Sequence, residues 1–276
     1  MTALLALLAS ATWGLADFLG GALSRRVATV RVLLWSQACG LLFALLAVAA
    51  GGWRTPGAWL WWAVGAGVFS AFGTACFYRA LALGTMSVVA PISGTSLVVP
   101  VVVALVLGER PSAVQLSGIA LAALGVVLAS GPELRGVDVQ RTAVLLAIAA
   151  AVGFGGTLVL VPRAGPDRWA MVTGTTALTM VAIVGSYALA RPPPGPPLRG
   201  RDSLGAAAIG GLAVSAFGLY AYASTRGLVA VLAVLASLYP VVTVVLAYAL
   251  LGERLRGIQL WGVLAAFAGV LCLAAG

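Results

Sequence analysis

The stretch Leu107-Gly108-Glu109-Arg110 decides the fold, because the sequence contains it twice. A second copy begins 144 residues later, as Leu251-Gly252-Glu253-Arg254. Ten of the twenty positions from 107 to 126 are identical at this offset, which also aligns Ser93 with Ser237. A period close to half the chain length predicts two homologous halves rather than a solenoid.

Composition indicates the class of protein. Of the 276 residues, 62% are hydrophobic and 8% are charged, and the mean hydropathy is +1.10. A soluble fold would have nowhere to bury this much apolar surface, so we predict a polytopic membrane protein. Two homologous halves in such a protein are typical of transporters, in which both halves form one binding cavity.

The net charge of +9 comes from arginine, because the chain contains no lysine and no histidine. The arginines lie in short segments between apolar runs, which is typical of topology signals and of contact with anionic lipid rather than with nucleic acid. Without histidine there is no His metal site and no Ser-His-Asp triad. Cys39, Cys76 and Cys272 show no paired spacing. We therefore expect no metal, no cofactor, no nucleic-acid partner and no enzymatic activity.

About twenty apolar residues cross a bilayer as a helix. On that basis we predict an all-α fold with ten transmembrane helices, at residues 2–22, 32–50, 58–83, 85–107, 112–130, 142–162, 169–190, 204–225, 227–251 and 257–275. Trp53, Trp59, Trp61 and Trp62 crowd one membrane edge and are expected to be interfacial anchors.

Five spans separate equivalent points of the two copies. Because this number of spans is odd, the second half must cross the membrane in the opposite orientation to the first. We therefore expect two inverted five-helix repeats, residues 1–131 and 142–276, joined by a loop at 132–141. Small residues recur on one face of the fifth helix, at Gly118, Ala122 and Gly125, and again in the tenth. This face either packs within a monomer or forms a homodimer interface.

Asp17 is the one acid expected inside a span, where a carboxylate costs roughly 2.5–3.5 kcal/mol. It shares a helix face with Ser10 and Trp13. Arg31 and Arg79 come from the same side of the membrane, so an ion pair between Asp17 and either of them is allowed by depth. Two interpretations stay open: a static ion pair or interfacial acid, and a group that binds a coupling proton or the substrate.

Prolines interrupt the fourth predicted helix twice and the ninth once, which frees backbone carbonyl groups one turn earlier. In a membrane such groups must face protein or a wet cavity. Small hydroxyl and aromatic side chains lie beside these interruptions, so we expect a central cavity there. The candidate substrate-binding residues are Trp13, Asp17, Tyr78, Arg79, Ser93, Thr95, Ser96, Tyr220, Tyr222, Ser237 and Tyr239, and the candidate kink or gate residues are Pro91, Pro100 and Pro240.

Other interpretations remain for some of these residues. Tyr78, Tyr220 and Tyr222 fit an aromatic belt at the membrane surface equally well. Glu109 and Glu253 are expected to be structural, each favouring the N-terminus of the helix that follows it and pairing with the adjacent arginine.

Several motifs together carry a family resemblance: Trp13-Gly14, Tyr78 with Ala80 and Gly84, the doubled Leu-Gly-Glu-Arg turn, Ser237-Leu238-Tyr239-Pro240, and Gly262 through Gly269. In them the chain resembles the ten-helix EamA-type branch of the drug/metabolite transporter superfamily. The resemblance implies two inverted five-helix repeats around a central cavity and the export or exchange of a small metabolite. Our leading hypothesis is therefore a secondary transporter that exports an amino acid, nucleobase or drug-like compound across a bacterial inner membrane by alternating access. The alternatives are an uncoupled facilitator or exchanger and, from another class, an integral-membrane enzyme.

Two lines of evidence disagree on orientation. Ten spans put both termini on one side, and eleven of the sixteen arginines fall on the other, which would make that other side cytoplasmic. The family resemblance implies cytoplasmic termini. Because Arg31 and Arg79 lie at span ends and Arg254 adjoins Glu253, the arginine bias is weakened, and we expect cytoplasmic termini.

Overall fold

The structure is a computed structural model of the chain, and it describes residues 1–24, 26–51, 53–83, 92–129, 141–165, 167–192, 198, 200–251 and 257–275. Helices with short connections make up this described part. The helices fall into ten spans: six are long and apolar enough to cross a membrane, and four are shorter apolar helices. The predicted all-α, polytopic membrane fold is therefore confirmed.

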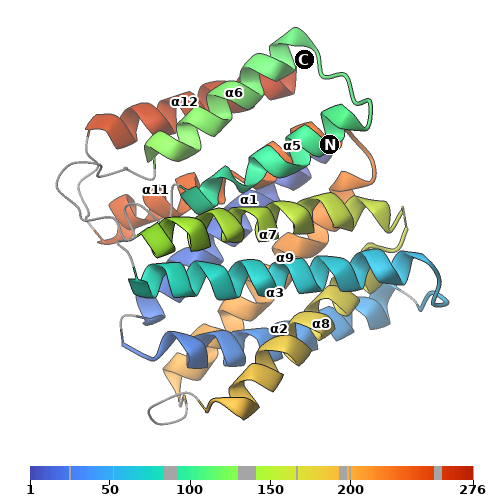
Figure 1. The fold of residues 1–276 in the computed structure, drawn as a ribbon, viewed down its shortest axis with the longest axis vertical. Helices are drawn as coiled ribbons and strands as arrows, with labels where there is room; N and C mark the ends of the chain where they lie inside the picture. Colours follow the sequence, from blue (N-terminus) through green and yellow to red (C-terminus); the bar gives the residue numbers. More distant parts are fainter. Residues whose placement is uncertain are drawn as a thin grey trace.

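The long helices are α1 (Thr2–Ser24), α2 (Thr29–Gly51), α3 (Trp59–Leu83), α7 (Arg141–Arg163), α8 (Trp169–Ala190) and α9 (Arg201–Ser224). The shorter ones are η1 (Thr95–Leu97), α5 (Val98–Val106), α6 (Ala113–Ala129), α10 (Val229–Ala236), α11 (Tyr239–Leu251) and α12 (Gly257–Ala275). At a rise of about 1.5 Å per residue, the long helices reach the roughly 30 Å of a hydrocarbon core. Figure 1 shows both chain termini at the same end of the bundle, which we call the terminal end.

The ninth predicted span consists of two helices rather than one. α10 ends at Ala236 and α11 begins at Tyr239, with a turn at Ser237 and Leu238 between them. Pro240 is the second residue of α11, where its missing N–H costs little because first-turn N–H groups lack helical partners.

The fourth span is interrupted in a similar way. The 3-10 turn η1 precedes α5, and Pro100 lies in the first turn of α5. Pro240 therefore begins a new helical segment, whereas Pro100 follows a change from 3-10 to α geometry within the apolar helical stretch Ile92–Val106. The third candidate, Pro91, lies outside the described residues.

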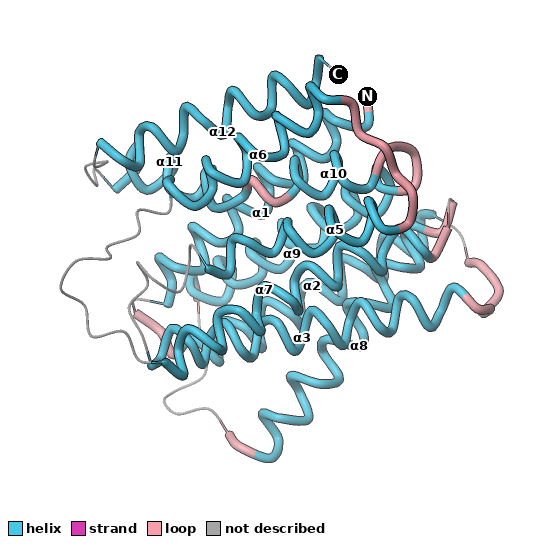
Figure 2. The backbone as a smooth tube through the Cα atoms, turned by 45° about the horizontal axis from the view of Figure 1, so that its top comes forward, coloured by secondary structure: helices cyan, strands magenta, loops and turns pink. Residues whose placement is uncertain are grey.

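Contacts between the two halves come in reciprocal pairs. α3 packs on α7 as its counterpart α9 packs on α1, and α2 packs on α9 as α8 packs on α3. α6 with α12 and α2 with α8 are pairs of counterparts, and they lie near opposite ends of the long axis of the molecule (Figures 1 and 2). Reciprocity of this kind is expected where a two-fold axis relates two repeats. The division of the chain at 132–141 stays a prediction, since only Arg141 of that segment is described and it begins α7.

The reciprocity extends to single residues where α6 meets α12. Gly125 packs against Ala266, and Gly269 packs against Ala122. Each contact is the other shifted by 144 residues. A Cβ atom on Gly269 would lie 2.6 Å from the Ala122 nitrogen and 2.8 Å from the Gly118 carbonyl oxygen, so the backbones need glycine to approach this closely. The face of small residues is thus used for packing within one chain.

We predict that Gly269→Val destabilises the protein by about 1–3 kcal/mol, because the new side chain must force α6 and α12 apart. For a chain of this size that corresponds to a fall in Tm of roughly 2–4 °C per kcal/mol in thermal unfolding of the detergent-purified protein. Gly185→Val in α8 is the matched control, because nothing lies within 4 Å of the Cβ position there. Equal losses in both variants would contradict the close α6–α12 packing.

Candidate functional site

An aromatic cluster surrounds Trp13 of α1 in the interior of the bundle. Its ring centroid lies 6.5 Å from that of Phe217, 6.2 Å from that of Tyr220 and 6.5 Å from that of Tyr239. The partners come from α9 and from the start of α11, both in the second half of the chain. The cluster therefore joins the two repeats.

Asp17 lies one helical turn beyond Trp13 and belongs to the same region. Its side chain is exposed although its neighbours Ala16 and Phe18 are buried. The Asp17 carboxylate acts electrostatically on the Tyr239 hydroxyl, which is also hydrogen-bonded to the Ser96 side chain. The Asp17 carboxylate of the first repeat therefore lies close to a tyrosine of the second.

Three buried serine hydroxyls lie on the segments that meet here. Ser10 of α1 is 1% exposed, Ser93 just before η1 is 2% exposed, and Ser237 between α10 and α11 is 1% exposed. None of the three hydroxyls has a hydrogen-bond partner among the described residues. An unpaired buried hydroxyl costs about 1–3 kcal/mol, so its presence requires an explanation such as a bound water or ligand.

Other buried hydroxyls in the described part of the chain are satisfied. Thr176 donates to the Ala63 carbonyl oxygen at 3.1 Å, and Thr157 donates to that of Gly153 at 3.1 Å. Ser36 donates to the Leu33 carbonyl oxygen at 3.0 Å. The unpaired state is therefore not general for buried hydroxyls in this fold, and it sets Ser10, Ser93 and Ser237 apart.

The terminal end is closed by a contact between the repeats through Glu109. α5 ends in a Schellman motif: the Gly108 N–H bonds to the Leu105 carbonyl and the Glu109 N–H bonds to the Ala104 carbonyl. Gly108 has φ +95°, a conformation that favours glycine. The first Leu-Gly-Glu-Arg turn thus ends a helix and fixes the direction of Glu109.

The Glu109 carboxylate caps α10 of the other repeat. It accepts hydrogen bonds from the backbone N–H of Val229 at 3.0 Å and of Ala230 at 3.1 Å. These groups begin α10, where the helix dipole favours negative charge. The prediction that Glu109 favours the following helix is wrong, because α6 has its own capping box between Ser112 and Gln115. Glu253 lies outside the described residues.

A second contact at the terminal end lies within the second repeat. Arg226 pairs with Asp167 at 2.9 Å and covers the Tyr222 ring, with its Cζ atom 3.9 Å from the ring centroid. Tyr222 also packs edge-on against Trp169 at 6.4 Å. Tyr222 is therefore part of the terminal end and not of the Trp13 cluster.

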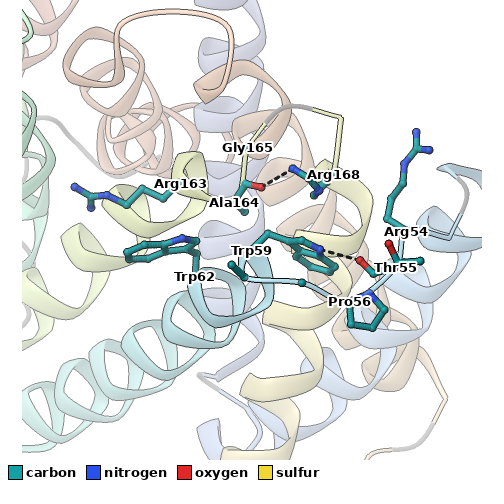
Figure 3. Close-up of a pocket in the computed structure, with 11 residues that line it drawn as sticks. Arg54, Thr55, Pro56, Trp59, Trp62, Arg163, Ala164, Gly165 and Arg168 are labelled. Carbon is teal, nitrogen blue, oxygen red and sulfur yellow. Dashed lines mark hydrogen bonds between the residues drawn. The ribbon is translucent and has the colours of Figure 1, made fainter.

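The tryptophans at the membrane edge differ in their surroundings. Trp53 and Trp61 are 71% and 76% exposed, as interfacial anchors would be. Trp59 is only 7% exposed, and its Nε1 donates to the Thr55 carbonyl oxygen at 3.1 Å (Figure 3). The anchor interpretation is wrong for Trp59, which packs inside.

Comparison with known proteins identifies the family. The model of the EamA-like transporter family matches residues 1–131 and 141–275. The chain belongs to the EamA-like transporter family. A solved structure described only as "Crystal structure of protein" matches 98% of this chain and 95% of its own, with a TM-score of 0.83 and 20% identity, and this likeness shows the fold alone. The search of curated proteins found no match.

Within this EamA-like chain, the structure brings together five of the predicted candidates. Trp13, Asp17, Ser96, Tyr220 and Tyr239 lie in or beside the aromatic cluster. Tyr220 is fully buried and its hydroxyl donates to the Leu158 carbonyl oxygen at 2.6 Å, which ties α9 to α7.

The remaining candidates are placed differently. The Thr95 hydroxyl donates to the Ile92 carbonyl oxygen at 2.6 Å within its own turn. Arg79 is exposed on α3. The pairing of Asp17 with Arg31 or Arg79 stays a prediction. The Tyr78 side chain lies outside the described part.

Sequence reasoning missed two contributors to the site of this EamA-like protein. Phe217 lies three residues before Tyr220, so the 3.6-residue period of α9 was the signal that places both rings on one face. Ser10 was noted only as a neighbour of Asp17 on α1. No group of three or more Cys, Asp or Glu side chains that could hold a metal ion occurs among the described residues.

We predict that Glu109→Gln accelerates amide hydrogen exchange at Val229 and Ala230 by about ten-fold, because a neutral amide replaces two charge-assisted hydrogen bonds. The measurement is hydrogen exchange of the detergent-purified protein resolved by peptide. Ser112→Ala serves as the control, since it opens the capping box of α6 without touching α10. Unchanged exchange at the start of α10 in Glu109→Gln would rule out the cap.

Proposed function

We propose that this protein is a secondary transporter of the bacterial inner membrane, which exports a small metabolite such as an amino acid, a nucleobase or a drug-like compound by alternating access. Membership of a transporter family supports transport of a small molecule. The proposed position of the substrate rests on the buried hydroxyls of Ser93 and Ser237, which have no hydrogen-bond partner among the described residues. They occupy equivalent positions of the two repeats, where a substrate held between both halves would be contacted by each.

The chemistry of the region narrows the substrate. Trp13, Phe217 and Tyr239 supply flat aromatic surfaces, and the serines supply hydrogen bonds. Asp17 supplies the charge, and no basic residue is part of the described cluster. This combination favours a small, partly apolar compound that carries an amine or another hydrogen-bond donor.

Alternating access requires a contact that closes one end and can be broken. The Glu109 cap on α10 has this character, because it joins the first repeat to the second through hydrogen bonds at the terminal end. Rocking of the repeats toward the open state would separate Glu109 from Val229 and Ala230. The free-energy cost of that step is modest, since water would hydrate the carboxylate and the N–H groups once they separate.

The alternative is an uncoupled facilitator or exchanger on the same site. Its supporting observation is that few described carboxylates near the cluster could bind a coupling proton. Asp17 acts on Tyr239, and Glu109, which acts on Tyr220, is already bonded to the N–H groups of α10. Both functions use the same serines, and proton coupling separates them.

We predict that Ser93→Ala and Ser237→Ala each raise the KM about three- to ten-fold while leaving the Tm unchanged or higher. Each change removes a substrate hydrogen bond but no bond within the protein. The measurement is counterflow in proteoliposomes, after a panel of amino acids, nucleobases and cationic drugs has identified the substrate. Ser36→Ala is the matched control, because that serine is equally buried but bonded to Leu33. Wild-type KM values in both site variants would remove these serines from the site.

We predict that Asp17→Asn abolishes uptake driven by a pH gradient and retains substrate counterflow, because only the first requires a titrating group. Both modes are measured in the same proteoliposome preparation. Loss of counterflow as well would make Asp17 a substrate ligand, and retention of both modes would show that Asp17 does not carry the coupling proton. Absence of pH-driven uptake in the wild-type protein would favour the uncoupled facilitator.

A further inference from the structure

A basic pocket opens at the terminal end, away from the aromatic cluster. Its volume is about 470 Å³, and it lies between the segment before α3 and the turn that joins α7 to α8. Figure 3 shows Arg54, Arg163 and Arg168 around it, with Trp59 and Trp62 along one side. Because α3 begins, α7 ends and α8 begins at this level, the pocket lies where the membrane headgroups would be.

Within the described part of the chain, the arginines of the pocket have no acidic partners. Among the described residues no carboxylate lies within ion-pair distance of Arg54, Arg163 or Arg168, and Asp167 of the same turn pairs instead with Arg226. Three guanidinium groups around one pocket repel one another unless an anion enters. The N-terminus of α8, which follows Arg168 directly, adds the positive end of its dipole.

Two of the arginines are held in place by neighbours that leave their charge unneutralised. Arg168 Nη1 donates to the Ala164 carbonyl oxygen at 3.3 Å, and it would lie only 3.0 Å from a Cβ atom on Gly165. Gly165 has φ +85°, so glycine provides both the turn and the room. The Arg163 guanidinium lies 5.6 Å from the Trp62 ring centroid in a cation–π contact.

The tryptophans indicate which environment the pocket meets. Trp62 is 41% exposed, as a ring in contact with lipid would be, and the buried Trp59 forms a fixed wall. Arginine beside tryptophan at the end of membrane spans is the arrangement that binds anionic headgroups.

From this geometry we infer that the pocket is a binding site for the phosphate of an anionic glycerophospholipid, of the phosphatidylglycerol class. The lipid phosphate accepts hydrogen bonds from the guanidinium groups while its acyl chains lie along the exposed face of α3. Occupancy would join the α2–α3 connection to the α7–α8 turn, and so one repeat to the other. The inference does not depend on which substrate is transported.

The test uses delipidated, full-length protein in detergent, with lipid binding followed by native mass spectrometry and by the shift in Tm. Phosphatidylglycerol should bind and raise the Tm, and phosphatidylcholine should do neither. Each of Arg54→Gln, Arg163→Gln and Arg168→Gln should weaken binding about five-fold, the effect of one charge near an anionic headgroup. The Arg191→Gln/Arg201→Gln double variant at the opposite end is the control and should bind as wild type.

Three outcomes would overturn the inference. One is wild-type affinity in all three single variants, and another is equal binding of both lipids. The third is complete displacement of phosphatidylglycerol by millimolar inorganic phosphate, which would make the pocket a site for a free anion. The single variants each retain two of the three arginines, and an unchanged circular-dichroism spectrum would show that each remains folded.

Discussion

Polar groups inside a bilayer must find partners within the protein, and this constraint decides where the helices of this chain can be interrupted. The two interruptions, η1 before α5 and the turn between α10 and α11, both lie in the interior. Lipid could not solvate the polar groups exposed there, whereas protein or a wet cavity can. The serines, the tyrosine and the aspartate of the candidate site lie around these points, because this is where polar side chains are tolerated in the bundle.

At the terminal end of the bundle, Glu109 completes a helix of the other repeat. The start of α10 presents N–H groups that no N-cap side chain satisfies, since residue 228 is a leucine. Glu109 reaches them from the other repeat because Gly108 ends α5 and turns the chain. One helix end therefore satisfies another, and the hydrogen bonds that complete α10 also hold the two repeats together. Because the same hydrogen bonds do both, a movement that separates the repeats also exposes the first N–H groups of α10.

Much of the fold could be predicted from the sequence, because its signals are periodic or local. The 144-residue repeat and the apolar runs predicted ten spans and an inverted pair of repeats, and the small residues of α6 and α12 predicted close packing. Proline positions predicted both interruptions. The contacts of Glu109 could not be predicted, because its partners are about 120 residues away and are backbone groups.

The candidate site was predicted only in part for the same reason. Helical spacing put Trp13 and Asp17 on one face, but it could not show which rings from α9 and α11 would meet that face. Tyr220 and Tyr222 lie two residues apart, on opposite sides of α9, so that only Tyr220 reaches Trp13. The sequence placed Asp17 within reach of an arginine, but it could not show that the carboxylate acts on Tyr239 of the other repeat.

The central claim is that substrate binds between the repeats, where the two interrupted helices meet. An experimental structure of the protein with its transported substrate bound tests this most directly. The account predicts density in contact with Ser93 and Ser237 and stacked on Trp13 or Tyr239. Substrate bound elsewhere, for example in the second pocket beside Trp35 and Val181 between α2 and α8, would contradict it.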